Sequence, residues 1–271
     1  MIEEFATYLR AVRGFSENTI RAYSNDLATF AKWAKEHSDI SKWRDIERDD
    51  IDMFLQYQQE HGYKPTTTNR QLSAISSLFR YFKRQGYDVE NPCQFESRRK
   101  QGKTIPSTIS PVQLANAYRH AVGVRKTMLG LFATTGIRIQ ELLDMKWEDI
   151  DFDANTIRIN GKGNKQRLVS TEPFVLADLK NTHETLKAQG KMFYLSQRKV
   201  RYMIYETLQP YCHARQLSPH AIRHTFATEL AKHGENAMTI AKILGHSKIE
   251  TSQKYVDMSQ LPTPRKGICL T

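Results

Sequence analysis

The sequence has few cysteines, and the three that it has lie far apart. Cys93, Cys212 and Cys269 have neither the even number of a disulfide framework nor the close spacing of a zinc site. We therefore expect reduced, buried or incidental thiols. The sequence also lacks a Walker loop and a carboxylate cluster for magnesium.

Long apolar runs are missing as well. The longest nearly apolar stretch, Met128 to Ile137, is about half as long as a bilayer requires. The N-terminal residues MIEEFATYLR contain no apolar run of the kind found in signal peptides. These absences predict a cytoplasmic protein with no membrane partner.

Positive charge is present in excess and is unevenly distributed. Lys and Arg number 40 and Asp and Glu 29, which gives a net charge of +11. Residues 1–97 carry a net charge of −2 and residues 98–271 a net charge of +13. A basic surplus favours an anionic partner, and phosphate backbones fit better than membranes because no basic amphipathic helix with bulky apolar residues stands out.

The length of 271 residues suggests two domains. Between them, residues 98–110 are polar, basic, interrupted by proline and without apolar periodicity, which predicts a linker. This basic segment is alternatively a solvated loop with no partner. The predicted domains are residues 1–97 and 111–271, the second including a C-terminal tail.

The N-terminal domain has the apolar spacing of four helices, the second capped by Ser16. The fourth helix follows Pro65 and stops near Gly86. Its first turns present short polar side chains and an arginine that suit phosphates or base edges, among them Thr67, Asn69 and Arg70. A capped, solvated helix start is an equally good interpretation of these residues.

The C-terminal domain is predicted to be helical with one small antiparallel sheet. It opens with an expected capping box, Ser110 to Gln113. Strand-like alternation occurs in Ile150–Phe152, Thr156–Asn160 and Gln166–Ser170. Further helices are expected at roughly Glu172–Ala188, Gln197–His213, Pro219–His233 and Ala237–Leu244. The chain as a whole is predicted to be mainly α with a small β-sheet.

One helix start carries reactive side chains. Ser218 is a predicted N-cap and Pro219 the first helical residue, which places His220 and Arg223 on one face near the positive end of the helix dipole. Such an end attracts phosphate. His220 and His224 are alternatively a metal pair or a solvated helix start, but no third ligand and no HExxH glutamate accompany them.

Two further segments are weak signals when taken alone. Arg138 follows a glycine break, and Glu141 one turn later can orient it, although such pairs are usually surface salt bridges. Leu244-Gly245-His246 is followed nine residues later by Tyr255, and a tyrosine in such a position is most often a packing residue.

Together these segments resemble the tyrosine recombinase (phage integrase) family, in particular its small two-domain Xer-type members. The resemblance rests on motifs in the family's order and spacing: Thr134–Leu142, Gly161–Arg167, His220-x-x-Arg223-His224, Leu244–His246 and Tyr255. It implies a helical, SAM-like core-binding domain and a mixed α+β catalytic domain that clamp DNA from opposite sides.

The resemblance also implies roles for single residues. Tyr255 is the expected nucleophile, and the guanidinium groups of Arg138 and Arg223 hold nonbridging phosphate oxygens. His220 is the expected proton acceptor or phosphate donor, and His246 a second hydrogen-bond donor.

The predicted hairpin supplies the remaining chemistry. Lys162 is expected to protonate the leaving 5′ oxygen. Lys165 is a rival for that role, although the family spacing selects Lys162. Glu141 is expected to orient Arg138.

Residues expected to contact DNA are Thr67, Asn69, Arg70, Lys165, Arg167, Arg198, Lys199 and Arg201. For the last three, a solvated helix face is the alternative.

The implied reaction is site-specific strand exchange through a 3′-phosphotyrosyl intermediate and a Holliday junction, carried out by a homotetramer on two DNA sites. The resemblance implies that this reaction needs no cofactor and no metal. Accessory DNA-bending or directionality proteins are expected partners. The alternatives are a type IB topoisomerase and a catalytically inactive DNA-binding relative. The tail after Tyr255 departs from the family pattern, because Pro262, Pro264 and Gly267 oppose the helix expected to dock on a neighbouring protomer.

Overall fold

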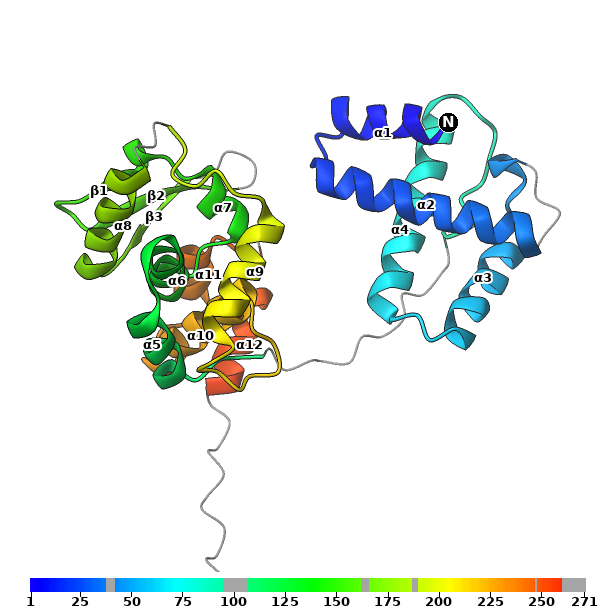
Figure 1. The fold of residues 1–271 in the computed structure, drawn as a ribbon. Helices are drawn as coiled ribbons and strands as arrows, with labels where there is room; N and C mark the ends of the chain where they lie inside the picture. Colours follow the sequence, from blue (N-terminus) through cyan, green and yellow to red (C-terminus); the bar gives the residue numbers. More distant parts are fainter. Residues whose placement is uncertain (38–41, 95–106, 162–165, 187–189, 247, 260–271) are drawn as a thin grey trace, which may run out of the picture. The chain divides into compact units, whose positions relative to one another are not determined.

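The computed structural model describes residues 1–37, 42–94, 107–161, 166–186, 190–246 and 248–259. The chain divides into two compact units, Met1–Thr104 and Ile105–Thr271, labelled α1 to α4 and α5 to α12 in Figure 1. The expected fold class, mainly helical with a small antiparallel sheet, is confirmed. Among the described residues, no helix is both long enough and apolar enough to cross a membrane.

The first unit consists of helices packed around an aromatic core. Its elements are α1 (Ile2–Ala11), α2 (Glu17–His37), the short 3-10 helix η1 (Trp43–Asp45), α3 (Arg48–Glu60) and α4 (Pro65–Arg84). The backbone N–H of Thr19 donates to Ser16 Oγ at 3.4 Å, so Ser16 caps α2 as expected. Phe30 of α2 and Phe54 of α3 are buried and meet edge to face, with ring centroids 4.9 Å apart.

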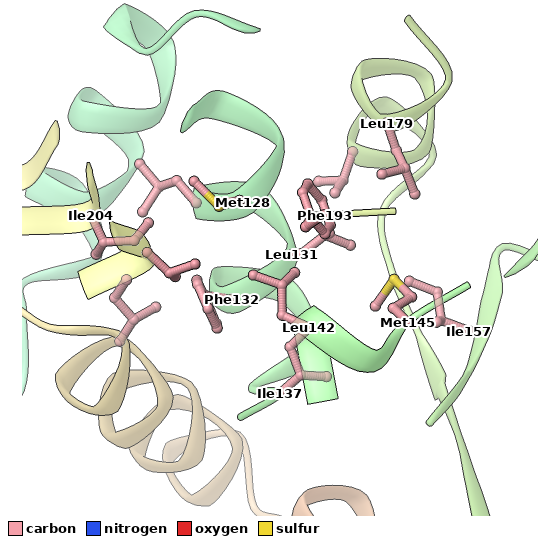
Figure 2. Close-up of a cluster of buried hydrophobic side chains, with 14 of the residues drawn as sticks. Met128, Leu131, Phe132, Ile137, Leu142, Met145, Ile157, Leu179, Phe193 and Ile204 are labelled. Atoms are coloured by element: carbon pink, nitrogen blue, oxygen red, sulfur yellow. The ribbon is translucent and has the colours of Figure 1, made fainter. Parts of the chain in front are cut away.

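The second unit begins with three helices and the sheet: α5 (Pro111–His120), α6 (Gly123–Thr135), α7 (Ile139–Asp144), the 3-10 helix η2 (Trp147–Asp149), β1 (Ile150–Asp151), β2 (Thr156–Asn160) and β3 (Gln166–Ser170). It continues with α8 (Pro173–Leu186), α9 (Gln197–Leu208), α10 (Pro219–Lys232), α11 (Ala237–Leu244) and α12 (Glu250–Ser259). Figure 2 shows its core, one buried cluster that includes Leu131 and Phe132 of α6, Ile157 of β2 and Ile204 of α9.

Several local predictions need correction. Ser110 precedes α5, but its side chain makes no capping hydrogen bond, so the predicted capping box is wrong. Helix α9 ends at Leu208 rather than His213, because Pro210 has no N–H with which to continue the helix. Helix α12 had no predicted counterpart, although it carries Tyr255.

The segment that enters the second unit is tied to α10. Most of the predicted linker, residues 98–106, lies outside the described residues. At the end of this stretch, Ile109 is buried, and its backbone N–H donates to Thr225 Oγ1 at 2.7 Å. The Thr225 hydroxyl in turn donates to the carbonyl of Ile109 at 3.1 Å. Residues just before α5 therefore belong to the packed second unit.

The sheet decides which hairpin side chains point inward. Strand β2 pairs antiparallel with β1 and β3, with Ile157 opposite Val169 and Ile159 opposite Arg167. Opposite residues share a face of the sheet, and Ile157, Ile159 and Val169 are all buried. Arg167 therefore lies on the inner face, whereas its neighbour Leu168 is exposed.

Gly136 allows three elements to approach one another closely. It ends α6 in the left-handed conformation, with φ of +60°. A Cβ at this position would lie 2.5 Å from Cδ1 of Phe226 in α10 and 2.8 Å from Cδ2 of Leu244 in α11. Glycine is required here by both backbone conformation and space, and the residues that follow it are thereby held against α10 and α11.

We predict that Gly136→Ala destabilises the second unit by about 2–4 kcal/mol, since it combines a strained positive φ with a steric clash. Gly123→Ala is the matched control. Gly123 has φ of +53° but nothing within 4 Å of an added Cβ, so only the conformational cost of about 1 kcal/mol is expected. Urea unfolding of both variants measures the difference, and equal changes in stability would contradict the close packing at Gly136.

Candidate active site

Arg223 is the buried centre of the candidate site. Ser218 caps α10, with its side chain accepting from the backbone N–H of Ala221, and Pro219 occupies the first turn as predicted. One turn further on, Arg223 is only 3% exposed. Its guanidinium donates to the carbonyl oxygen of Gly136 and, at 2.7 Å, to that of Leu244. Burial and the nearby Arg138 lower the pKa of Arg223, but a guanidinium starts so high that it stays charged at neutral pH.

Arg138, the residue just before α7, reaches the same place. Its Nη1 donates to the Leu244 carbonyl at 3.3 Å and its Nη2 to the Gly245 carbonyl at 3.0 Å. The carbonyl of Leu244 therefore accepts from both Arg138 and Arg223. These carbonyls lie at the C-terminus of α11, where the helix dipole is negative and favours cations. The Arg138 side chain is 38% exposed, so one side of this pair faces solvent.

Glu141 neutralises part of this positive charge. It accepts from the Nη1 of Arg138 at 2.8 Å and from the backbone N–H of the same residue at 2.8 Å, so it is placed to orient Arg138. It also accepts two hydrogen bonds of 2.9 Å from Arg167. Burial alone would raise the pKa of Glu141, but the hydrogen bonds and charges of Arg167 and Arg138 lower it.

Arg167 lies inside the protein. Its side chain is 11% exposed, and its Nε donates to the Ile243 carbonyl at 2.8 Å. Gly245 leaves room for it, because a Cβ there would lie 3.0 Å from its Nη1. Arg167 is one of the residues expected to contact DNA, yet its hydrogen bonds are made to Glu141 and α11. The strand alternation of β3 is the sequence signal for this inward orientation.

Tyr255 is buried beside these cations. Its side chain is 1% exposed and packs in a small cluster with α10 and α11 residues that include Ala227 and Leu244. Its hydroxyl lies 2.7 Å from Nδ1 of His224. Burial raises the pKa of Tyr255, and the nearby Arg223 opposes this rise. The phenol is therefore protonated at neutral pH in this state.

Three histidines surround the tyrosine and differ in exposure. His220 is exposed, and its ring meets that of His224 edge to face at a centroid distance of 5.1 Å. His246 Nδ1 lies 2.8 Å from Oγ of the buried Ser252, and its ring stacks near Tyr255 at 6.5 Å. Burial, followed by the charge of Arg223, lowers the pKa of His220 and that of His246, the latter to about 4. At neutral pH these side chains are therefore uncharged.

Two of these contacts were not predicted from the sequence. His224 belongs to the predicted His220-x-x-Arg223-His224 motif and to the alternative metal pair, but no role beside Tyr255 was expected of it, although its position four residues after His220 places it on the same helix face. Ser252 was not among the predicted site residues, although its position three residues before Tyr255 places it on the same face of a helix. Among the described residues, no group of three His, Cys, Asp or Glu side chains gathers as a metal site.

The other predicted residues fall into three places. Lys162 and Lys165 lie outside the described residues. Arg198, Lys199 and Arg201 are exposed in the first turns of α9, where Gln197 Nε2 donates to Gln140 Oε1 of α7 at 2.8 Å. Arg201 also contributes to lowering the pKa of His220, so the cationic start of α9 lies beside the site.

The remaining candidates begin α4 in the first unit. Thr67 and Asn69 are partly buried. Arg70 donates two hydrogen bonds, of 2.7 and 2.8 Å, to the buried carboxylate of Asp26 on α2. This ion pair ties α4 to α2, while half of the Arg70 side chain remains exposed.

Two anchored guanidinium groups beside a buried tyrosine are an arrangement that suits the handling of a phosphate, with the tyrosine hydroxyl as the neighbouring nucleophilic group. The chain belongs to the phage integrase family: the model of that family matches residues 112–261, which is more than half of the chain. The model of the phage integrase N-terminal SAM-like domain matches residues 2–86.

Individual relatives cover nearly the whole chain. Tyrosine recombinase XerC of Pediococcus pentosaceus is 27% identical over 96% of this chain and 94% of its own, and XerC of Staphylococcus aureus strain MRSA252 is 28% identical over 95% and 91%. In fold, the chain is similar to XerH recombinase bound to its palindromic difH substrate, with a TM-score of 0.77 and 18% identity over 96% of this chain and 82% of that one. A lambda integrase dimer bound to a core site gives a TM-score of 0.72 at 18% identity, covering 98% of both chains.

We predict that Glu141→Gln lowers the free energy of unfolding of the second unit by about 3–5 kcal/mol, because it leaves buried cations unpaired. The lowered pKa of Glu141 means that its stabilisation is fully present above its ordinary value of 4.5 and is lost as pH falls through the folded value. In Glu141→Gln, the free energy of unfolding should therefore fall less between neutral and acidic pH than in wild type.

Urea unfolding at neutral pH and at about pH 3.5 measures both effects. Glu148→Gln is the matched control, since Glu148 is 74% exposed and pairs with Lys146 at 3.1 Å. An exposed pair of this kind contributes less than about 1 kcal/mol. If the two variants behave alike, the buried network around Glu141 does not have the importance assigned to it.

Proposed function

We propose that this protein is a site-specific DNA recombinase of the tyrosine type, which cuts and rejoins DNA strands by transesterification. The observation that carries the proposal is the convergence of Arg138 and Arg223 on the end of α11, beside the hydroxyl of Tyr255. Family membership and the XerC relatives support the same function.

The arginine pair suits a phosphodiester in its transition state. Attack on phosphorus concentrates negative charge on the nonbridging oxygens, and two planar guanidinium groups can donate paired hydrogen bonds to them. Arg138 and Arg223 are already fixed by Glu141 and by backbone carbonyls, so little reorganisation is needed when the phosphate arrives. The exposed His220 and the partly exposed Arg138 form the open side of the site.

Tyr255 is the proposed nucleophile. Its oxygen bonds to phosphorus, the bond from phosphorus to the 5′ oxygen breaks, and a 3′-phosphotyrosyl link and a free 5′ hydroxyl result. We assign protonation of the leaving oxygen to Lys162. Attack by a 5′ hydroxyl of a partner strand reverses the step and exchanges strands, and two exchanges form and resolve a Holliday junction. The phosphodiester is conserved, so the reaction consumes no nucleotide.

We further propose a homotetramer on two duplex sites, with accessory DNA-bending or directionality proteins as additional partners. The tail after α12 is the segment proposed to contact a neighbouring protomer. Several solved relatives of similar fold are bound to DNA, including XerH on its difH substrate and lambda integrase on a core site. We expect activity on cytoplasmic, nucleoid-associated DNA, in integration, excision, inversion or resolution.

The test of the proposed function is denaturing capture of the protein from its host cells without added crosslinker, followed by sequencing of the attached DNA. Wild type should carry covalent DNA, and Tyr255→Phe should carry none while still binding the recovered sites in a gel. Tyr87→Phe, an exposed tyrosine of the first unit, is the control and should be captured like wild type.

Other outcomes distinguish the alternatives. Covalent DNA on Tyr255→Phe would remove Tyr255 as the nucleophile. Relaxation of any supercoiled plasmid without a defined site would favour a type IB topoisomerase. Binding without any adduct, also on nicked synthetic sites that trap the intermediate, would indicate an inactive DNA-binding relative.

We predict that DNA affinity falls steeply with salt, because bound cations release counterions from the phosphate backbone. Replacing Arg198, Lys199 and Arg201 by alanine should reduce the slope of log K against log salt by about one for each cation that no longer binds a phosphate. The control is Lys232→Ala, which removes a cation paired with Glu229 about 18 Å along α10 from His220. Titration of a captured site by fluorescence anisotropy measures both slopes, and an unchanged slope in the triple variant would place DNA elsewhere.

A further inference from the structure

The two histidines at the start of α10 occupy different surroundings. His220 is exposed and lies within the field of Arg223, Lys254 and Arg138. His224, one turn further into the helix, is partly buried and has its Nδ1 at 2.7 Å from the Tyr255 hydroxyl. A nucleophile and a base within hydrogen-bond reach are the geometric signature of an activated nucleophile. Because only His224 contacts the Tyr255 hydroxyl, the two histidines are placed for different functions.

We propose that His224 is the group that accepts the phenol proton of Tyr255, and that His220 instead faces the phosphate. This inference rests on the proposed function, since it assigns a step within that reaction. It differs from the expectation drawn from the sequence, in which His220 is the proton acceptor. The other nearby histidine, His246, has its Nδ1 directed to Ser252 Oγ at 2.8 Å.

The hydrogen-bond chemistry at His224 has one consistent direction. A phenol O–H donates, so Nδ1 of His224 accepts and the ring proton is placed on Nε2. The ring lies between those of His220 and Tyr255, at centroid distances of 5.1 and 5.8 Å. The backbone of His224 belongs to α10 and accepts from Thr228 Oγ1 at 2.8 Å. The acceptor is thus positioned by a buried helix rather than by a loop.

Electrostatics explain why the proton stays on Tyr255 until a substrate is present. Burial, followed by the charges of His220, Lys254 and Arg223, lowers the pKa of His224 to about 4. Burial raises the pKa of Tyr255 at the same time. Both partners are therefore neutral without DNA, and proton transfer between them is unfavourable.

A phosphodiester changes this balance. It brings a negative charge to Arg138 and Arg223, and that charge offsets the cations that disfavour protonated His224. We therefore expect the pKa of His224 to rise when DNA binds. Because Tyr255 is only 1% exposed, its hydroxyl must also be uncovered as the phosphate enters. Activation of the nucleophile is in this way linked to the presence of its substrate.

The proposed step balances. The Tyr255 hydroxyl gives its proton to Nδ1 of His224 while its oxygen bonds to phosphorus, and the bond from phosphorus to the 5′ oxygen breaks. The 5′ oxygen takes a proton from the general acid. On rejoining, the 5′ hydroxyl gives its proton back to the general acid as its oxygen attacks phosphorus, the bond from phosphorus to Tyr255 breaks, and His224 returns the proton to the phenol oxygen. No oxidant, reductant or further reactant is needed.

The test compares His224→Asn with His220→Asn. The amide oxygen of asparagine can accept the phenol hydrogen bond near the position of Nδ1 but cannot take its proton. On nicked duplexes made from the captured sites, His224→Asn should form covalent adduct about 10²- to 10⁴-fold more slowly than wild type. Its rate should rise about tenfold per pH unit as hydroxide replaces the base. Replacing Tyr255 by difluorotyrosine, whose phenol is more acidic, should restore His224→Asn but not His220→Asn.

Equal rates for His224→Asn and wild type, or fluorotyrosine rescue of His220→Asn alone, would overturn the proposal. Absence of adduct in wild type would instead count against the proposed function, so the two failures are distinguishable. If His224→Asn does not fold, ¹⁵N NMR of the wild-type histidines replaces it. The Nδ1 of His224 should remain unprotonated from about pH 6 to pH 8 in the free protein, and its pKa should rise on adding the nicked duplex. A protonated Nδ1 without DNA would contradict the assignment.

Discussion

The site depends on one electrostatic constraint: three arginines must lie close together inside the folded protein. Arg138, Arg167 and Arg223 repel one another, and burial makes that repulsion stronger. One carboxylate, Glu141, and the carbonyl oxygens at the end of α11 offset it. Because Glu141 supplies a single negative charge, the cluster keeps an excess of positive charge that a phosphate can neutralise.

Much of the surrounding fold serves this arrangement. Gly136 brings the start of α7 against α10 and α11, and β3 places Arg167 beside Glu141 of α7 and the carbonyl of Ile243 in α11. Helix α12 then packs on α10 and α11 and buries Tyr255 beside the cations. Burial, together with the neighbouring positive charges, keeps His224 and His246 neutral. The site is therefore positively charged enough to attract an anion, while the proton stays on Tyr255 when no anion is bound.

Sequence patterns were reliable where local chemistry dominates. The cap at Ser218, the proline after it, the apolar faces of α2 and α4 and the three strands follow from short-range spacing, and the structure has them. The roles expected of Arg138 and Glu141 came with the family resemblance, and their contact is present. The capping box at Ser110 failed, because matching residue types do not guarantee that side chains make the bond.

The sequence by itself determined the class of fold, the unequal distribution of charge and the residue types available for phosphate chemistry. Only the tertiary structure decided which of those residues contact one another. Arg167 meets Glu141 because the fold brings β3 beside the start of α7, and Tyr255 of α12 meets His224 of α10 rather than His220. The residues of the first pair are 26 positions apart in the sequence and those of the second pair 31. Contacts over such separations depend on how the helices and the sheet pack, and the spacing of residues in the sequence does not predict them.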